Sequence, residues 1–328
     1  MTPTTRVMKA EPATIAEAVR CLASGGLVAF PTETVYGLAA DARDGMAVAR
    51  LYDAKGRPAF NPLIAHVADA GAARGLAVFD AAAERLAAAF WPGPLTLVLP
   101  KADNGLVCDL ATAGLDSIAV RVPDHPVAHD ILVAFGRPLV APSANRSGHI
   151  SPTTAQHVLA DLNGRIDLIV DGGATPVGVE STIVACLGRP ALLRPGGVPR
   201  ADIERVLGHA LAEAASTATD EGEAPLAPGQ LASHYAPHGR LRLDATHIAP
   251  GEALLAFGPD LPAGAERAAR VLNLSPRADL IEAAANLFSH LRTLDAAGAT
   301  TIAVMPVPHG GLGEAINDRL KRAAAPRI

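Results

Sequence analysis

Aromatic residues are scarce in this chain of 328 residues, at 3% of the sequence, whereas hydrophobic residues make up 49%. A buried core must therefore be built mainly from Ala, Val, Leu and Ile. Positive charge does not dominate either, because the formal net charge is -5. General binding of nucleic acid depends on Lys and Arg that neutralise phosphates, so this balance argues against it. Local basic pockets remain compatible with the composition.

Cysteines are few, and their spacing indicates no metal or disulfide chemistry. Cys21, Cys108 and Cys186 are far apart in the sequence and form no CxxC pair. Buried apolar thiols in a reducing compartment are the simpler interpretation. Proline or charge interrupts every apolar run well short of a membrane span, and the N-terminus has no apolar core of the signal-peptide type. We expect a soluble cytoplasmic protein that contacts no membrane.

Familiar catalytic signatures are also missing. The sequence has no GxxxxGKS/T loop and no convincing GxGxxG, which are the standard signatures of nucleoside triphosphatases and dinucleotide-binding domains. It has neither GxSxG nor HExxH, so the simplest hydrolase interpretations are excluded as well.

The length of the chain exceeds what one hydrophobic core usually serves, so two domains are expected. Between Ser216 and Gly239 the hydrophobic periodicity gives way to Thr, Asp, Glu, Pro and Gly, a composition typical of a linker. We therefore predict a first domain over residues 12–215, a linker over 216–239 and a C-terminal domain over 240–328.

Apolar runs and helical patterns mix irregularly in the first domain, which predicts an α/β fold around one twisted sheet with parallel and antiparallel pairs. The pattern after residue 240 alternates strand and helix and predicts a smaller, Rossmann-like α/β domain with a partly parallel sheet. Among the helix boundaries, Thr14 with Glu17 has the spacing of a capping box. Ser151 before Pro152 is typical of a helix start. The last helix of the first domain is predicted over 203–215.

One stretch, from Leu27 to Asn61, is the strongest candidate for a functional site. Four apolar residues typical of a buried strand lead into the polar segment Pro31–Leu38, and Lys55 and Arg57 follow a short helical pattern. Lys55 and Arg57 are compatible with a solvated surface pair or with a clamp for phosphate, since Lys offers a point charge and Arg a planar fork of donors.

Other polar residues leave similar alternatives open. Ser143 and Asn145 are ordinary turn formers or hydrogen-bonding partners of a nucleotide. Arg121 in an apolar strand must face water, pair with an acid or bind an anion, and Arg194 in its Arg-Pro-Gly turn has the same ambiguity. His66 is a core histidine or a ligand-binding one. Glu180 could cap local backbone, and Tyr235 could pin the linker to the body of the protein. Residues alone indicate an anion-binding pocket with basic and hydroxyl groups.

Together these segments resemble the catalytic domain of the YrdC-type threonylcarbamoyl-AMP synthases in order and spacing. Residues 12–200 carry the resemblance. His234-Tyr235-Ala236-Pro237 in the linker is similar to the longer, two-domain form of that family. The motifs are Phe30-Pro31-Thr32-Glu33-Thr34-Val35-Tyr36-Gly37-Leu38, Lys55-x-Arg57, Asn61-Pro62-Leu63-Ile64, Trp91-Pro92-Gly93-Pro94-Leu95-Thr96, Ala119-Val120-Arg121, Ala141-Pro142-Ser143-Ala144-Asn145, Val179-Glu180-Ser181-Thr182 and Leu193-Arg194-Pro195-Gly196.

The resemblance implies a reaction in which L-threonine, bicarbonate or CO2, and ATP give L-threonylcarbamoyladenylate and pyrophosphate. Separate transferase proteins then pass the threonylcarbamoyl group to the adenosine next to the anticodon of tRNA. The resemblance also implies a concave, positively charged cavity in a twisted mixed sheet, with Mg2+ accompanying ATP and no metal ligand from the protein side chains.

Roles of single residues are carried over from the same resemblance. Lys55, Arg57, Ser143, Asn145, Ser151 and Arg194 are expected to contact ATP, with Lys55 and Arg57 as the catalytic clamp. Thr32, His66, Arg121 and Ser181 are expected to hold threonine or its carbamate. Tyr235 is expected to touch the nucleotide when the linker covers the pocket as a lid.

Two other functions compete with this hypothesis. The basic cavity could hold RNA directly, with weak contact to tRNA, although the acidic composition disfavours it. A related domain could also make a different carbamoyl-adenylate during assembly of a hydrogenase cofactor. The lack of zinc-finger cysteines and of an acylphosphatase-like segment disfavours that context.

Overall fold

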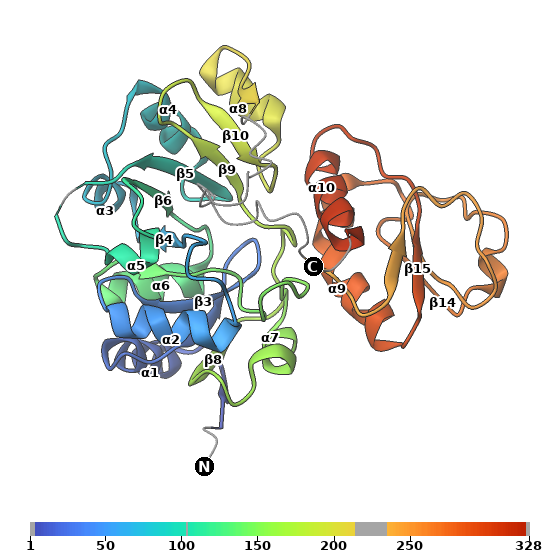
Figure 1. Cartoon of the computed structure of the whole chain (residues 1–328), viewed down its shortest axis with the longest axis horizontal. Coiled ribbons are helices and arrows are strands. Elements are labelled where there is room, and N and C mark those ends of the chain that lie inside the picture. Colours follow the sequence, from blue (N-terminus) through green and yellow to red (C-terminus); the bar gives the residue numbers. More distant parts are fainter. Residues whose placement is uncertain (1–3, 103, 214–234, 326–328) are drawn as a thin grey trace.

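The computed structural model describes residues 4–102, 104–213 and 235–325. Figure 1 shows two lobes side by side, with the first part of the chain (blue to yellow) in the larger lobe and the end of the chain (orange to red) in the smaller one. None of the helices in the described residues is both long enough and apolar enough to cross a membrane.

A sheet of eleven strands, counted over the described residues, runs through the larger lobe in the order β1-β8-β2-β3-β7-β4-β6-β5-β9-β10-β11. Parallel pairs such as β4 with β6 and β5 with β9 are mixed with antiparallel pairs such as β2 with β3 and β5 with β6. The predicted mixed α/β fold is confirmed. The strands are β1 (Arg6–Lys9), β2 (Val28–Pro31), β3 (Tyr36–Asp41), β4 (Ile64–His66), β5 (Leu95–Pro100), β6 (Ser117–Arg121), β7 (Leu139–Val140), β8 (Leu168–Asp171), β9 (Thr182–Ala185), β10 (Ala191–Arg194) and β11 (Ala212–Glu213).

Helices pack against this sheet in three groups, each with its own hydrophobic cluster. One cluster joins α1 and α6 to β2 and β8, a second joins α2 and α7 to β3, and a third joins α4 and α8 to β5 and β6. The helices of this lobe are α1 (Pro12–Ala23), α2 (Gly45–Lys55), α3 (Ala70–Arg74), α4 (Ala81–Phe90), α5 (Asp109–Thr112), α6 (Pro126–Phe135), α7 (Ala155–Leu162) and α8 (Arg200–Leu207).

Three predicted helix boundaries are wrong, and local chemistry explains each. Helix α1 begins at Pro12 with Glu11 at its N-cap, because proline suits the first turn of a helix; Thr14 is buried inside the helix. Helix α7 begins after Thr154, whose hydroxyl accepts from the His157 amide, so Ser151 caps nothing.

The third boundary concerns the end of α8. Gly208 adopts a left-handed conformation with φ 78° and ends the helix at Leu207, well before the predicted residue 215. The polar segment after β2 also differs from a simple loop, since Tyr36–Asp41 returns as β3 and pairs with β2 in an antiparallel hairpin.

The smaller lobe is an open α/β domain whose described strands are all parallel, in the order β12-β15-β13-β14. The predicted Rossmann-like character is confirmed, and the parallel portion extends over the whole sheet. Its elements are β12 (Arg240–Arg242), β13 (Ala253–Ala256), the 3-10 turn η1 (Ala265–Arg267), β14 (Arg270–Asn273), α9 (Leu280–Ala296), β15 (Thr301–Val304) and α10 (Gly313–Ala324).

Helices α9 and α10 face the larger lobe, and the two lobes share one hydrophobic cluster (Figure 1). Val35, Ile150 and Val179 of the larger lobe join Tyr235 and the buried faces of both helices in that cluster. Gly178 approaches the backbone of α9 so closely that a β-carbon there would lie 2.4 Å from the carbonyl oxygen of Ala284. The lobes are therefore closely packed where the pocket lies.

Candidate functional site

A cavity of about 50 Å³, partly open to solvent, collects side chains from segments far apart in the sequence. His66 ends β4 and Arg121 ends β6, and these residues are register partners in a parallel pair. Because parallel strands end at the same edge of a sheet, the two side chains meet there. The cavity is lined by Val35, Arg57, Ile64, His66, Arg121, Ala141, Pro142, Ser143, Glu180, Ser181, Arg194 and Tyr235.

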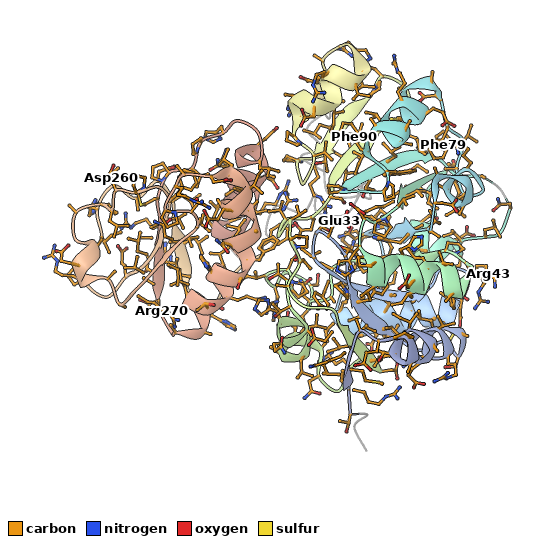
Figure 2. The ribbon with its side chains drawn as sticks, turned by 180° about the vertical axis from the view of Figure 1, so that it is seen from behind. Glu33, Arg43, Phe79, Phe90, Asp260 and Arg270 are labelled. Carbon is orange, nitrogen blue, oxygen red and sulfur yellow. The ribbon has the colours of Figure 1, made fainter. Side chains whose placement is uncertain are left out.

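Arg121 is held by the polar segment that follows β2. Its terminal nitrogen donates to Glu33 Oε1 at 2.6 Å and to the Thr34 hydroxyl at 2.9 Å. The side chain is only 4% exposed, and its Nε has no hydrogen-bond partner among the described residues. Figure 2 shows Glu33 near the junction of the lobes, far from the peripheral Arg43. A buried guanidinium with an unused donor at a cavity wall is suited to bind an additional anionic or polar group.

His66 is neutral in this position. Burial, assisted by the positive charge of Arg121, lowers its pKa to about 3. Its Nδ1 lies 3.1 Å from the carbonyl oxygen of Ile64, which can only accept, so Nδ1 carries the proton. The other ring nitrogen is then left as a hydrogen-bond acceptor.

Arg57 and Arg194 approach the cavity from other segments. Arg57 donates from Nε to the Asn61 carbonyl at 3.3 Å and from a terminal nitrogen to the Pro62 carbonyl at 3.0 Å. Burial lowers the pKa of Arg57 to about 10, and the positive charge of Arg194 contributes to this shift. Arg194 donates to the Ser181 carbonyl at 2.9 Å and to the Ser181 hydroxyl at 3.2 Å. Both guanidinium groups stay charged near neutral pH.

Glu180 lies in the cavity wall beside these arginines. Its carboxylate accepts from the Ser151 hydroxyl at 2.5 Å and from Arg319 Nε of helix α10 at 2.8 Å. Burial by itself would raise the pKa of Glu180, but the charges of Arg319 and Arg194 and the bond from Ser151 outweigh it and lower the pKa to about 2. Glu180 is therefore an ionised, structurally bound carboxylate and not a proton donor at neutral pH.

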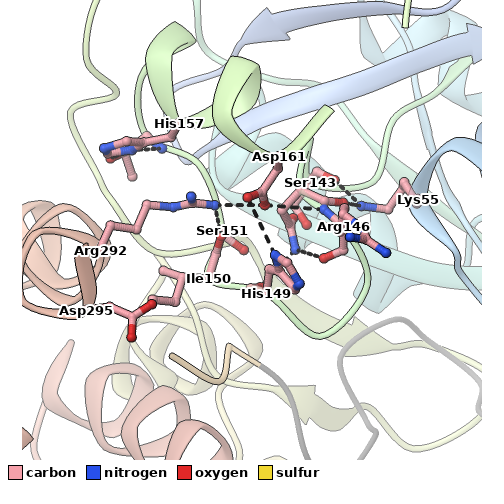
Figure 3. A network of polar contacts seen from close by, with 12 residues as sticks. Lys55, Ser143, Arg146, His149, Ile150, Ser151, His157, Asp161, Arg292 and Asp295 are labelled. Carbon is pink, nitrogen blue, oxygen red and sulfur yellow. Dashed lines mark hydrogen bonds and ion pairs between the residues drawn. The ribbon is translucent and has the colours of Figure 1, made fainter. Parts of the chain in front are cut away.

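Lys55 braces the loop that supplies Ser143. Its ammonium group donates to the Ser143 carbonyl at 2.5 Å and to the Asn145 carbonyl, and the side chain is 2% exposed. Burial, with the charge of Arg57, lowers its pKa well below the usual value. From the other side, Arg292 of α9 donates to Asp161 at 3.1 Å and to the Ile150 carbonyl (Figure 3). The loop is thus fixed by one cation from each lobe.

Some of the predicted site residues line the cavity, and the others lie in the layer of residues behind the lining. The predicted residues that line it are Arg57, His66, Arg121, Ser143, Ser181, Arg194 and Tyr235. Those that brace it from behind are Thr32, Lys55, Asn145 and Ser151. Thr32 donates its hydroxyl to the Val35 carbonyl at 2.7 Å, which shapes the turn before β3. The assignment of these residues to ATP or threonine stays a prediction.

Sequence reasoning missed several residues that build the site. Glu33 and Thr34 stood in the quoted motif without a role, although a carboxylate and a hydroxyl near a buried arginine are its natural partners. Arg319 and Arg292 gave no local signal, because they lie on amphipathic helices where arginine is usually solvated. Of the linker motif, Tyr235 is described, whereas Ser233 and His234 lie outside the described residues.

The chain is similar to known proteins over most of its length. A family model described as "Telomere recombination" matches residues 20–196, and one described as "Threonylcarbamoyl-AMP synthase, C-terminal domain" matches residues 198–325. A threonylcarbamoyl-AMP synthase from Bacillus subtilis is 41% identical over 96% of this chain and 94% of its own length. The chain belongs to the threonylcarbamoyl-AMP synthase family.

Two further relatives show the two forms of the family. The crystal structure of Sua5 from P. abyssi complexed with L-threonine superposes with a TM-score of 0.87 at 39% identity, covering 98% of this chain and 97% of that one. A threonylcarbamoyl-AMP synthase from Chromohalobacter salexigens is 40% identical and is matched over 90% of its length, but over only 52% of this chain. This protein has the longer form, in which a C-terminal domain adjoins the pocket.

Proposed function

We propose that the cavity makes L-threonylcarbamoyladenylate and pyrophosphate from L-threonine, bicarbonate or CO2, and ATP. The protein is a threonylcarbamoyl-AMP synthase, a nucleotidyltransferase of tRNA threonylcarbamoyladenosine synthesis. Sua5 from P. abyssi was crystallised with L-threonine, which supports threonine as a substrate here. Partner proteins that transfer the threonylcarbamoyl group to tRNA belong to this proposal, as does location in the cytoplasm.

The observation that carries the proposal is the charge of the cavity. Arg57 and Arg194 both line it, and Arg194 is close enough to contribute to the lowered pKa of Arg57. Among the described residues, no carboxylate forms an ion pair with Arg57. Two neighbouring guanidinium groups in a desolvated wall are stabilised by an anionic ligand. A triphosphate satisfies this requirement.

The chemistry needs positioning more than proton transfer. A carbamate formed on the threonine amine is already an anion, and its oxygen attacks the α-phosphorus while the bond to the β-phosphate oxygen breaks and pyrophosphate leaves. Arg57 and Arg194, with the Ser143 region, are assigned to the phosphates. Arg121 is assigned to the threonine carboxylate, and His66 and Ser181 to its polar groups. Thr32, Lys55, Asn145 and Ser151 act by holding these residues in place.

Magnesium fits this site as part of the ATP substrate. No cluster of three or more His, Cys, Asp or Glu side chains in the described part of the chain could hold a metal ion. Glu180 in the cavity wall is paired with Arg319, and Glu33 is paired with the cavity-lining Arg121. Mg2+ retains water and phosphate ligands readily, so it would enter on the triphosphate and neutralise part of its charge.

Tyr235 supports a covering role for the end of the linker. It lines the cavity and is 1% exposed, with its ring stacked on Phe288 of α9 at a centroid distance of 5.3 Å. We propose that this segment covers the nucleotide and excludes water from the adenylate. Replacing Tyr235 by Ala should weaken ATP binding and increase hydrolysis of the adenylate. Unchanged values for both would refute the lid.

One experiment tests the reaction directly. Purified protein is incubated with ATP, Mg2+ and bicarbonate, with either threonine or serine, and the adenylate is identified by mass spectrometry. We expect threonylcarbamoyladenylate and pyrophosphate to appear only when threonine, bicarbonate and ATP are all present. Absence of any adenylate would contradict the proposal, and a serine product would change its specificity.

The family match favours the enzyme over an RNA-binding module that uses the same cavity. A tRNA gel shift at several salt concentrations, with and without ATP, distinguishes the two. An RNA-binding module should bind tRNA without ATP or threonine and lose affinity steeply with salt.

A further inference from the structure

Arg319 is a fully buried arginine that reaches the pocket from the other lobe. It lies on α10 of the C-terminal domain and is 0% exposed. Its Nε donates to Glu180 Oε2 at 2.8 Å, and another nitrogen donates to Asp318 Oδ2 at 2.6 Å. Burying a guanidinium is costly unless carboxylates and hydrogen bonds compensate it, so this side chain is tied to Glu180.

The same guanidinium also contacts the aromatic wall of the pocket. Its central carbon lies 5.5 Å from the centroid of the Tyr235 ring, a distance typical of a cation–π contact. That ring also stacks on Phe288 of α9. Tyr235 has φ 64°, which is unfavourable for a residue with a β-carbon, so surrounding contacts must hold its backbone in place.

The charges around Glu180 suggest what Arg319 does for the site. Glu180 contacts Arg319 directly, and Arg194 donates to the next residue, Ser181, in the same cavity wall. The positive charges of both arginines stabilise the ionised form of Glu180. If a neutral side chain replaced Arg319, Glu180 would lose its ion pair and would still feel the charge of Arg194. The carboxylate would then compete with a bound anion for Arg194.

We propose that Arg319 is a positioning residue of the reaction: it neutralises Glu180 and holds the Tyr235 ring, so that Glu180 does not compete with the phosphates of the substrate for Arg194. The inference rests on the proposed function, because it assumes that Arg194 faces a phosphate. It assigns the C-terminal domain a direct part in the site, since helix α10 supplies one of the charges that set the electrostatics of the pocket.

The test uses pyrophosphate as a probe, because its binding can be measured by calorimetry without turnover. Arg319→Met should weaken pyrophosphate binding by about tenfold, as expected for the loss of about one charged contact. Arg319→Met combined with Glu180→Gln removes the competing carboxylate and should restore the Kd to within about threefold of the wild type. In turnover assays the single variant should raise the KM for ATP more than that for threonine.

A matched control comes from the same helix. Glu314 of α10 forms an ion pair with Arg200 across the lobes at 2.7 Å, and neither residue lines the pocket. Glu314→Gln should leave the pyrophosphate Kd unchanged, which separates loss of a contact between lobes from loss of the charge on Arg319. Arg319→Lys keeps the charge and should bind pyrophosphate nearly as well as the wild type.

Two results would overturn the inference. One is wild-type pyrophosphate binding in folded Arg319→Met, and the other is an equal loss in the single and the double variant. If Arg319→Met does not fold, the Glu180→Gln variant alone tests the inference. This variant should bind pyrophosphate at least as tightly as the wild type, and weaker binding would contradict the inference. Failure of the proposed function appears separately, as absence of adenylate in the wild-type reaction.

Discussion

At the scale of single residues, the buried histidine of the pocket gives a prediction about pH. The pKa of His66 is lowered to about 3 in the folded protein, whereas an unfolded histidine titrates near 6.5. Between these values the unfolded chain binds one proton more, so acidification lowers the free energy of unfolding by about 1.4 kcal/mol per pH unit. His66→Gln should remove this contribution, measured by urea unfolding between pH 4.5 and 6.5. The same slope in variant and wild type would contradict the assignment of a neutral His66.

His157 gives an internal comparison for that measurement. Burial, with the charge of Arg292, lowers the pKa of His157 to about 4. Acidification therefore lowers the free energy of unfolding through His157 as well, but over a narrower pH range than through His66. Because both lowered pKa values lie below the measured range, His157→Gln should flatten the curve over that range in the same direction as His66→Gln. The double variant should flatten it by the sum of both effects, because the two histidines belong to different networks.

The sequence predicted these individual residues unevenly. Charged and polar residues at strand ends, such as Arg121 and His66, could be predicted because parallel strands deliver their ends to one edge. The position of Lys55 could not, because its partners are backbone carbonyls that only the folded loop presents. The role of Arg319 could not be predicted either, because its partner Glu180 is far away in the sequence and lies in the other lobe.

At the scale of elements, the loop Ser143–Ser151 depends on the two cations that hold it. Removing Lys55 leaves the carbonyls of Ser143 and Asn145 without this donor, and an unsatisfied buried group costs about 1–3 kcal/mol. Lys55→Met should therefore lower both the melting temperature and the rate of pyrophosphate release.

Arg57→Met is the matched comparison, because Arg57 follows the same helix and faces the cavity. It should lower pyrophosphate release by roughly ten- to a hundredfold, as expected for one charge-assisted hydrogen bond, with a smaller change in melting temperature. Thermal unfolding and a pyrophosphate assay on both variants test the distinction. Equal loss of stability in the two variants would show that Lys55 is not the structural member of the pair.

Element boundaries were predicted best where the sequence carries its own stop signals. Helix α4 begins after Asp80, whose side chain accepts from the Ala83 amide, and ends at Phe90 just before Trp91-Pro92, so both of its ends carry a local signal in the sequence. Ser151 looked like an equally good cap, but its hydroxyl is taken by Glu180 in the folded protein. A tertiary hydrogen bond therefore decided against a local preference.

At the scale of the whole molecule, the shared cluster between the lobes gives a prediction about cooperativity. Val35, Ile150 and Val179 are buried against α9 and α10, so separating the lobes would expose them to water. Wild-type protein should therefore unfold in a single calorimetric transition. The domain boundaries predicted from the sequence remain a prediction, and two transitions in the wild type would show that the lobes are independent units.

Gly178→Ala tests whether the contact with α9 sets this cooperativity. Its β-carbon would lie 2.4 Å from the Ala284 carbonyl oxygen and 2.5 Å from the α-carbon of Ala285, so α9 would have to move. Gly173→Ala is the matched control: Gly173 has φ +86° against +77° for Gly178, but open space around its β-carbon position. Both substitutions incur the strain of a positive φ, about 1 kcal/mol. Only Gly178→Ala should also separate the transition into two and lower adenylate formation, because the helices carrying Phe288 and Arg319 would shift away from Tyr235 and Glu180.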